Sequence, residues 1–360
     1  MQQLTVHSLQ IRPVAVPLDP PMITASGEIT ESPLVLIDLR TEEGVTGHAY
    51  LFCYTALVMP AIANVLRSIE GLVKGGPAAP QVLDRLLRGR FRLLGVQGLV
   101  GMAMAGLDMA AWDAQARAAG VPLVRLLGGV PGAVRAYDSH GMLSPDQAAA
   151  AVDAGRARGF TAIKVKIGHP SLADDLAVIR ATRQAAGPQM AIMVDYNQSL
   201  TVPEAVRRAA VLDEEGVTWI EEPVPAEDLI GHAKVAAAAR TPVQTGENWW
   251  GLPDMEKAVA ARASDLAMLD VMKIGGVTGW LKAAGLAEAA GLPVSSHIWP
   301  EVSAHLLAVT PTAHFLEYLD TAAPILEQPA LVEDGCLVIR DEPGSGVAWN
   351  EEAVSRYAAG

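Results

Sequence analysis

Three acidic residues recur at equal spacing, each near the end of a short, β-branched apolar run. Asp195, Glu221 and Glu247 lie 26 residues apart. Because the ends of neighbouring parallel strands meet at one edge of a sheet, these carboxylates should converge. Oxygen ligands with no adjacent cysteine or histidine suit a hard cation that keeps positions open for substrate, so we predict Mg²⁺, with Mn²⁺ next. A zinc site would favour histidine-rich ligation, and the sequence has no His-x-His.

Two types of basic side chain accompany these acids. Lys164 and Lys166 lie two apart in one run, so both should face the same side. Their repulsion should lower the pKa of each ammonium below the usual ~10.4, unless they are merely a surface pair. His297 ends a later run and Asp270 the run before it, and such a carboxylate orients the ring and raises its basicity. We therefore predict two bases on opposite sides of one metal, with Lys273 as a weaker alternative for the second.

Further polar residues end or follow the other runs. Three carboxylates around Mg²⁺ leave one negative charge, which Lys164 balances, so a carboxylate substrate is best tolerated if Glu317 is protonated. A neutral Glu317 could donate a hydrogen bond to developing negative charge. Ser139 and Asn197 are further candidates at strand ends. Glu222 should point away by strand alternation and have a structural role.

The elements that must position these groups follow a regular pattern from about residue 133. Short β-branched runs alternate with alanine-rich helical stretches, as in βαβ units, and eight such runs are enough to close a barrel. The runs are 134–138, 162–167, 190–195, 217–221, 243–247, 266–270, 294–297 and 314–317. No helix follows the eighth, so we predict an α/β fold, a modified TIM barrel of the type (β/α)7β.

The first third has a different pattern. Apolar runs at 33–39 and 45–51 flank a turn and predict a hairpin. Helical periodicity follows at 56–72, 81–91 and 99–118. We predict three parts: an α+β N-terminal capping domain at 1–130, the barrel at 131–323, and a C-terminal segment at 324–360. The last contains strands at 330–332 and 336–340 and should return to the capping domain.

Composition narrows the class of protein. The chain has 360 residues, of which 51% are hydrophobic, enough for a large core. A net charge of −13 disfavours nucleic acid and anionic membranes as partners. Two cysteines make no disulfide framework. No signal peptide is visible and no apolar stretch reaches about 18 residues, so we expect a soluble, cytoplasmic protein with no membrane partner.

These residues fall in motifs that resemble the enolase superfamily, mandelate racemase subgroup, over essentially the whole chain. The motifs lie at 36–39, 108–113, 137–140, 164–166, 194–199, 219–223, 246–248, 272–280, 295–297 and 304–316. The resemblance implies that Asp195, Glu221 and Glu247 bind Mg²⁺ together with the hydroxyl and one carboxylate oxygen of the substrate.

The resemblance also implies a reaction. Lys166 would take the α-proton from the S enantiomer of a 2-hydroxy carboxylate, and His297, paired with Asp270, from the R. Lys164 and Glu317 would stabilise an enolate-like intermediate. Ser139 and Asn197 would be supporting polar contacts. Family members are often symmetric octamers, so a homo-octamer is expected.

The substrate pocket is predicted from a loop at 22–29 that closes over the site in this family. The side chains expected to line it are Met22, Ser26, Ile29, Phe52, Tyr54 and Leu319. Such an apolar cage suits an aryl group. Met22, Ser26 and Ile29 replace small aliphatic residues of the mandelate-type pocket, so heteroaryl or vinyl analogues are alternatives to phenyl.

The resulting hypothesis is a Mg²⁺-dependent racemase of mandelate-type aryl 2-hydroxy acids, working by two-base 1,1-proton transfer. The alternative enzyme is an acid-sugar dehydratase, which must hydrogen-bond several hydroxyl groups, and the aliphatic loop offers little for that. A catalytically silent binding or scaffold protein on the same fold is the remaining alternative.

Overall fold

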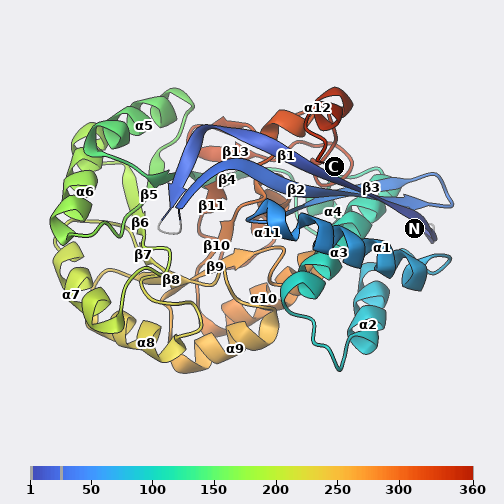
Figure 1. Cartoon of the computed structure of the whole chain (residues 1–360), viewed down its shortest axis with the longest axis horizontal. Coiled ribbons are helices and arrows are strands. Elements are labelled where there is room, and N and C mark those ends of the chain that lie inside the picture. The colour runs from blue at the N-terminus through green and yellow to red at the C-terminus, as the bar shows by residue number, and fades with distance from the viewer. Residues whose placement is uncertain (1–2, 25–26, 360) are drawn as a thin grey trace.

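The computed structural model describes residues 3–24 and 27–359, and its N-terminal part is built on an antiparallel sheet (Figure 1). The sheet has the order β1-β2-β3. Its strands are β1 (Val6–Thr24), β2 (Gly27–Thr41) and β3 (Thr46–Phe52). The hairpin expected at 33–39 and 45–51 is present, with Leu36 opposite Tyr50.

Residues 22–24 and 27–29, expected to belong to a loop, are instead the end of a two-stranded ribbon formed by β1 and β2. Met22 pairs with Ile29 there. β-Branched residues such as Ile23 favour extended backbone, which the loop prediction did not weigh. Ser26, expected in the substrate pocket, lies outside the described residues. The ribbon reaches from the N-terminal sheet across to the strand ends of the larger sheet (Figure 1).

Helices cover one face of this sheet. They are the 3₁₀ turn η1 (Ala56–Val58), α1 (Met59–Val73), α2 (Pro80–Arg90) and α3 (Gly98–Ala119). α3 is buried on most sides and contacts β3 closely. At Gly47 an added Cβ would lie 2.0 Å from the carbonyl oxygen of Ala110, so only glycine permits this approach.

One helical stretch, Ala56–Val73, is long and apolar enough by length and composition to cross a membrane. This corrects the expectation that no apolar stretch reaches about 18 residues. In the structure the segment is an amphipathic surface helix: α1 buries Ile62, Leu66 and Ile69 and contacts α3 and β1.

The larger part is an α/β unit with a curled sheet. Strands β4 to β10 follow one another in parallel pairing, and β11 pairs with β4. The backbone N–H of Ser296 donates to the carbonyl of Phe315, so the segment entering β11 also lies beside β10. The strands are β4 (Ala133–Met142), β5 (Ala162–Lys166), β6 (Ala191–Asp195), β7 (Ile220–Glu221), β8 (Val243–Thr245), β9 (Leu266–Asp270), β10 (Val294–His297) and β11 (Leu316–Tyr318).

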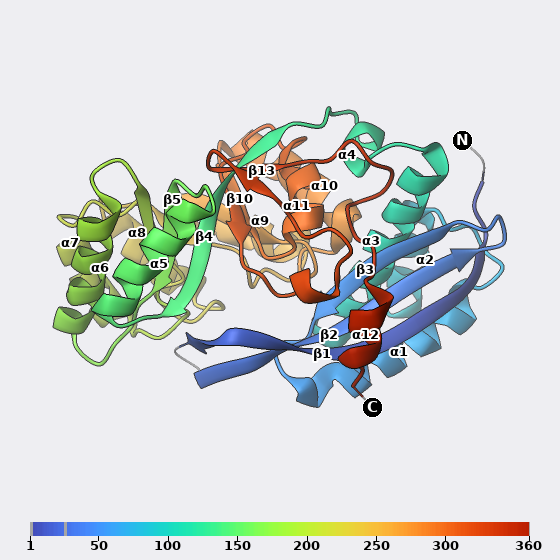
Figure 2. The same cartoon turned by 90° about the horizontal axis from the view of Figure 1, so that it is seen from above.

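Helices form the outer layer around this sheet (Figures 1 and 2). After the short α4 (Leu123–Leu126) they are α5 (Pro145–Ala157), α6 (Leu172–Ala186), α7 (Val202–Leu212), α8 (Leu229–Ala238), α9 (Leu252–Ala261), α10 (Gly276–Ala290) and α11 (Pro300–Leu307). The carboxyl ends of the strands therefore meet at one edge, as the alternating pattern predicts.

Two strands that carry acidic residues differ from the predicted runs. β7 begins at Ile220 and is followed by Glu222 with φ 34°, and β8 ends before Gly246 with φ 133°. Glu247 therefore lies beyond its strand, on a turn. β4, in contrast, continues past the predicted end, so that Ser139 lies inside it.

The C-terminal segment crosses back to the N-terminal sheet (Figure 2). Its elements are η2 (Ala323–Ile325), β12 (Val332–Glu333), β13 (Cys336–Val338) and α12 (Glu351–Arg356). β13 pairs antiparallel with β4. The indole N–H of Trp349 donates to Asp38, and the backbone N–H of Ala359 donates to the carbonyl of Pro13.

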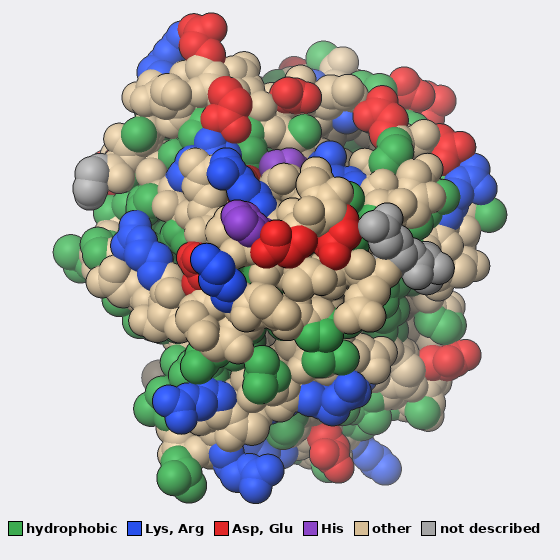
Figure 3. Space-filling view, turned by 90° about the vertical axis from the view of Figure 1, so that its right-hand side faces the viewer, with side chains coloured by type: hydrophobic (Ala, Val, Ile, Leu, Met, Phe, Trp, Pro, Cys, Tyr) green, Lys and Arg blue, Asp and Glu red, His purple; other side chains and the backbone are tan. Residues whose placement is uncertain are grey.

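The net negative charge is not gathered in one patch on the face shown in Figure 3. Acidic and basic side chains are interspersed there, with hydrophobic side chains between them.

Candidate active site

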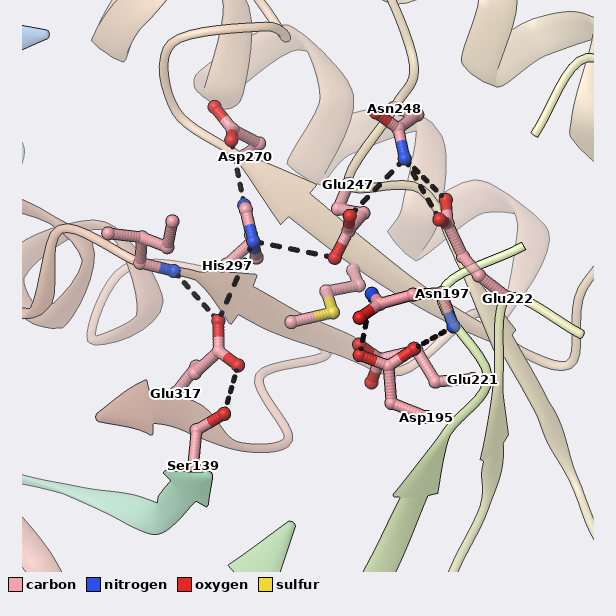
Figure 4. A network of polar contacts seen from close by, with 12 residues as sticks. Ser139, Asp195, Asn197, Glu221, Glu222, Glu247, Asn248, Asp270, His297 and Glu317 are labelled. Atoms are coloured by element: carbon pink, nitrogen blue, oxygen red, sulfur yellow. Dashed lines mark hydrogen bonds and ion pairs between the residues drawn. The ribbon is translucent and has the colours of Figure 1, made fainter. Parts of the chain in front are cut away.

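Ionisable side chains gather at the carboxyl ends of the strands of the curled sheet (Figure 4). In the register, Lys166 at the end of β5 lies opposite Asp195 on β6, and Asp195 lies opposite Glu221 on β7. Farther round, His297 lies opposite Asp270. All five side chains are buried. The sheet thus brings the predicted bases and carboxylates to one place.

Both lysines face this interior and form ion pairs. The Nζ of Lys164 lies 2.5 Å from Oε1 of Glu221 and 2.8 Å from Oε1 of Glu317. The Nζ of Lys166 lies 2.6 Å from Oδ2 of Asp195. A surface lysine pair is therefore excluded.

The expectation of a lowered lysine pKa is wrong for this arrangement. Burial and the repulsion from Lys164 lower the pKa of Lys166, but Asp195, Glu247 and Glu317 together outweigh them, so the pKa lies above its ordinary value. The pKa of Lys164 is likewise held well above its ordinary value, because Glu221 and Glu317 outweigh burial. Sequence spacing identified the repelling lysine but not the carboxylates that lie closer.

His297 is held between carboxylates (Figure 4). Its Nδ1 lies 2.8 Å from Oδ2 of Asp270, and its Nε2 lies 3.4 Å from Oε2 of Glu247 and 3.9 Å from Oε2 of Glu317. Burial lowers the pKa of His297, but Glu247 and Asp270 outweigh it and raise the pKa to about 9. The imidazole is therefore protonated at neutral pH in the metal-free protein.

Glu317 is ionised in the free protein, whereas the neutral acid is expected only beside a bound carboxylate substrate. Ser139 Oγ donates to its Oε1 at 2.7 Å, and the backbone N–H of Ile298 donates to its Oε2 at 3.0 Å. Burial raises the pKa of Glu317, but Lys164 and His297 outweigh it and hold the pKa well below its ordinary value. The sequence-based charge count did not include these contacts.

The donor set of Asp195, Glu221 and Glu247 fits a divalent cation by chemistry and by charge. Burial raises the pKa of Glu221 to about 7, and although Lys164 opposes this, Asp195 and Glu247 add to the rise. Six buried carboxylates surround these strand ends, against three lysines and one histidine. The acids are Asp195, Glu221, Glu222, Glu247, Asp270 and Glu317, and the bases are Lys164, Lys166, Lys273 and His297.

With every acid and base of this cluster in its charged form, two negative charges are in excess, which is the charge of one divalent cation. Burial and mutual repulsion raise the pKa of Glu221 and Glu222, and a bound cation would favour their ionised forms. Carboxylate oxygens are the ligands that Mg²⁺ prefers. Within 3–24 and 27–359, no group of three His, Cys, Asp or Glu side chains already stands in a metal-binding arrangement. Instead, Lys166 donates a hydrogen bond to Asp195, and Lys164 donates one to Glu221. We conclude that the residues fit Mg²⁺, provided that these lysines move aside.

A cavity of about 680 Å³ opens over the charged cluster. Its lining includes five of the six side chains predicted for the substrate pocket: Met22, Ile29, Phe52, Tyr54 and Leu319. Polar lining comes from Lys166, Asn197, Glu247, Lys273 and His297 among others. The five predicted side chains form an apolar wall of the cavity that the two candidate bases also line, and the ribbon contributes Met22 and Ile29 to it.

The supporting residues predicted at strand ends lie on different sides. Asn197 donates to Asp195 from its backbone N–H at 2.7 Å and from Nδ2 at 3.0 Å, and it lines the cavity. Ser139 contacts Glu317 and lines a neighbouring cavity of about 360 Å³, which shares Met22 with the first.

Sequence reasoning missed three residues of this cluster. Glu222, expected to point away, is buried, and both its oxygens accept hydrogen bonds from Nδ2 of Asn248 at 2.9 Å. Strand alternation stops at Glu221, because the left-handed backbone of Glu222 begins the turn. Lys273, considered only as a weaker base, donates to Asn248. In the sequence, Glu222 follows Glu221 directly and is itself followed by Pro223. This was the available signal that the strand ends at Glu221.

A curled α/β sheet with buried carboxylates and bases at its strand ends defines a class of metal-dependent enzyme, and comparison with known proteins gives the family. Residues 146–353 match the model of the enolase C-terminal domain-like family. Residues 6–128 match the mandelate racemase / muconate lactonizing enzyme N-terminal domain. The chain belongs to the enolase superfamily.

Similar proteins of this family differ in reaction. An enolase from Bradyrhizobium, crystallised with magnesium and mandelic acid, is 49% identical over 100% of both chains, with a TM-score of 0.97. A racemase from Streptomyces coelicolor A3(2) with bound magnesium is 29% identical, with a TM-score of 0.92, over 98% of this chain and 100% of the other. The L-talarate/galactarate dehydratase of Salmonella typhimurium is 30% identical over 96% of this chain and 88% of its own.

Proposed function

We propose that this enzyme is a Mg²⁺-dependent racemase of mandelate-type aryl 2-hydroxy acids, built on a (β/α)7β barrel. The observation that carries the proposal is the order of the strands. Lys166 ends β5 and His297 ends β10, and β6, β7 and β8, which lead to the three acidic ligands, lie between them. Two bases therefore flank one carboxylate cluster, as proton transfer to either face of one carbon requires.

Each base has a stated partner. Magnesium, bound by Asp195, Glu221 and Glu247, would supply positive charge for the carboxylate and hydroxyl oxygens of the substrate. With its carboxylate bound to the metal, Asp195 would no longer stabilise the protonated form of Lys166. The neutral amine of Lys166 could then take the α-proton of the S enantiomer. His297, oriented by Asp270 at Nδ1, takes it from the R enantiomer through Nε2. In either direction the opposite group, in its protonated form, donates its own proton to the other face of the carbon.

Stabilisation of the enolate falls to Lys164 and Glu317. Lys164 is fully buried and donates to carboxylate oxygens from below the cavity. Glu317 is ionised in the free protein, but a substrate carboxylate beside it adds a like charge and raises its pKa. In its protonated form Glu317 can donate to the developing negative charge.

The apolar wall supports an aryl substrate. The rings of Phe52 and Tyr54 pack at a tilt of 54° with centroids 4.8 Å apart, and both line the cavity with Met22 and Ile29. The Bradyrhizobium relative that binds mandelic acid shares this fold over its whole length. The substrate proposed is therefore a 2-hydroxy carboxylate with an aryl or heteroaryl group.

Acid-sugar dehydration is the second candidate, because the Salmonella typhimurium dehydratase is 30% identical. Such a reaction would use the same carboxylates and the His297–Asp270 pair. It would also require hydrogen bonds to several substrate hydroxyls, which Met22, Ile29 and Phe52 do not offer.

Nuclear magnetic resonance in heavy water tests the proposal. R- and S-mandelate are incubated separately with enzyme and Mg²⁺. We expect racemisation with deuterium at the α-carbon, and no exchange once the metal is chelated. Formation of a keto acid from galactarate, with no exchange of mandelate, would replace the proposal by the dehydratase. Absence of both reactions together with intact metal binding would favour a silent binding protein.

A further inference from the structure

We propose that Lys273 is a positioning residue for the metal-binding carboxylate of Glu247 and acts through the side-chain amide of Asn248. The inference rests on the proposed magnesium site. It assigns a role to a buried lysine that is neither one of the two proposed bases nor one of the two residues proposed to stabilise the enolate.

The three side chains form a relay from the cavity wall to the carboxylates. Lys273 follows β9, and its Nζ donates to Oδ1 of Asn248 at 2.5 Å. At the other end of the same amide, Nδ2 donates to Oε1 of Glu247 at 3.2 Å. The same Nδ2 also donates to both oxygens of Glu222 (Figure 4).

The chemistry of the two ends determines which way the amide faces. An ammonium can only donate hydrogen bonds, and an ionised carboxylate can only accept them. If the amide of Asn248 turned over, its NH₂ would face the ammonium of Lys273 and its oxygen would face the carboxylate of Glu247, and both of these hydrogen bonds would be lost. Lys273 therefore selects the orientation in which Asn248 offers its NH₂ to Glu247.

Lys273 is itself held in place from several sides. Its Nζ lies 4.6 Å from the ring centroid of Tyr54 and 6.0 Å from that of Trp250. Its backbone N–H donates to Oδ1 of Asp270 at 2.9 Å. The residue is only 7% exposed, and its hydrogen-bond partner in the relay is a neutral amide rather than a carboxylate. The ammonium thus keeps a fixed position from which it can orient Asn248.

A single substitution of Lys273 would not isolate this role. The lysine also repels a bound cation, so loss of its charge tightens metal binding, whereas loss of orientation weakens it. The two effects have opposite signs. A double-mutant cycle separates them, because in a protein that lacks the Asn248 amide only the charge effect remains.

The experiment measures Mn²⁺ binding to the full chain by electron paramagnetic resonance, without substrate. The proteins are wild type, Lys273→Met, Asn248→Ala and the double variant. We expect Asn248→Ala to weaken Mn²⁺ binding by about 10-fold or more, the range for a side chain that orients a metal ligand. The effect of Lys273→Met is the ratio of the Mn²⁺ affinities measured with and without this substitution. We expect this ratio to be about 10-fold lower in the wild-type background than in the Asn248→Ala background.

Two further variants serve as controls. Lys273→Arg keeps the positive charge and offers only hydrogen-bond donors to Asn248, so it should bind Mn²⁺ within about threefold of wild type. Lys282→Met removes the same charge from an exposed side chain paired with Asp84, and its effect should be equal in both backgrounds. Circular dichroism melts check that each variant is folded, and if Lys273→Met is not, Lys273→Gln takes its place in the cycle.

Each outcome decides the matter. An equal effect of the Lys273 substitution in the two backgrounds overturns the relay while leaving the magnesium site intact. Failure of the wild type to bind Mn²⁺, or unchanged binding by Glu247→Gln, overturns the magnesium site and the relay with it. Coupling of about 10-fold, with retention by Lys273→Arg, supports the relay.

Discussion

The two sides of the site hold their bases in different ways. On the lysine side, Lys166 is paired directly with Asp195, a proposed metal ligand. On the histidine side, His297 is bound at Nδ1 by Asp270, which is no proposed ligand, and its Nε2 faces the cluster. The proton affinity of Lys166 therefore depends on what else binds Asp195, whereas that of His297 is raised by Glu247, a proposed ligand, and also by Asp270, which is not one.

Removal of one base at a time should give the largest effects. His297→Asn should still exchange the α-proton of S-mandelate through Lys166 and fail on the R enantiomer. Lys166→Met should show the reverse. Each should lower racemisation by about 10²–10⁴-fold, the usual contribution of a general acid–base group. Deuterium incorporation, followed separately for each enantiomer, is the measurement.

Equal loss of exchange from both enantiomers in either variant would contradict the assignment of one base to each face. Asp270→Asn is the matched control on the histidine side. Like His297→Asn, it should exchange the α-proton of the S enantiomer faster than that of the R enantiomer, because the imidazole of His297 loses the acceptor that orients it.

Glu317 should affect both enantiomers equally, because it is proposed to act, with its ion-pair partner Lys164, on the enolate that both directions share. Glu317→Gln removes the acid that would donate to the enolate. We expect kcat to fall by about 10²–10³-fold for both enantiomers, since the loss of one such donor costs about 2.7–4 kcal/mol. Ser139→Ala, which removes only a hydrogen bond to Glu317, should give a smaller loss. A strong bias toward one enantiomer in Glu317→Gln would place Glu317 with one base instead.

The histidine side should also show in the pH dependence of stability of the metal-free protein. The pKa of His297 is about 9 in the folded state, above the ~6.5 of an unfolded chain. Its stabilising contribution is thus complete below about pH 6.5 and is lost as the pH rises toward 9. Urea unfolding in the presence of a chelator, at pH 6 and pH 9, measures it.

The comparison needed is between wild type and His297→Asn, since other buried groups titrate in the same range. The difference in unfolding free energy should be larger at pH 6 than at pH 9, by on the order of 2 kcal/mol. A difference that is independent of pH would mean that Asp270 and Glu247 do not hold the imidazolium.

Much of this site follows from periodicity, and what does not follow depends on turns and on contacts between strands. Alternation of β-branched runs placed Asp195, Glu221 and Lys166 at neighbouring strand ends. It could not place Glu222, whose φ of 34° ends the alternation. Nor could it give the charge states, because the pKa of Lys166 is set by Asp195, 29 residues away in sequence and 2.6 Å away in space.

The N-terminal domain shows the same limit. Apolar runs predicted the hairpin of β2 and β3, but the loop at 22–29 was predicted from the family resemblance and not from the residues themselves, and residues 22–24 and 27–29 form a ribbon. Pairing of Met22 with Ile29 is a contact between strands, which neither residue signals alone.

The smallest effect should come from the apolar wall, which touches neither base. Ile29 is half-buried on the ribbon and lines the cavity. Ile29→Ala should raise the KM for mandelate by about fivefold, equivalent to about 1 kcal/mol of partly buried apolar surface, and leave kcat unchanged. Lactate, which has no aryl group, should be unaffected. Glu31→Ala, an exposed position on the same ribbon, is the control. The ratio of S to R exchange should stay as in wild type. If that ratio changes, the ribbon positions the bases as well as the aryl group, and the two sides of the site are not independent of it.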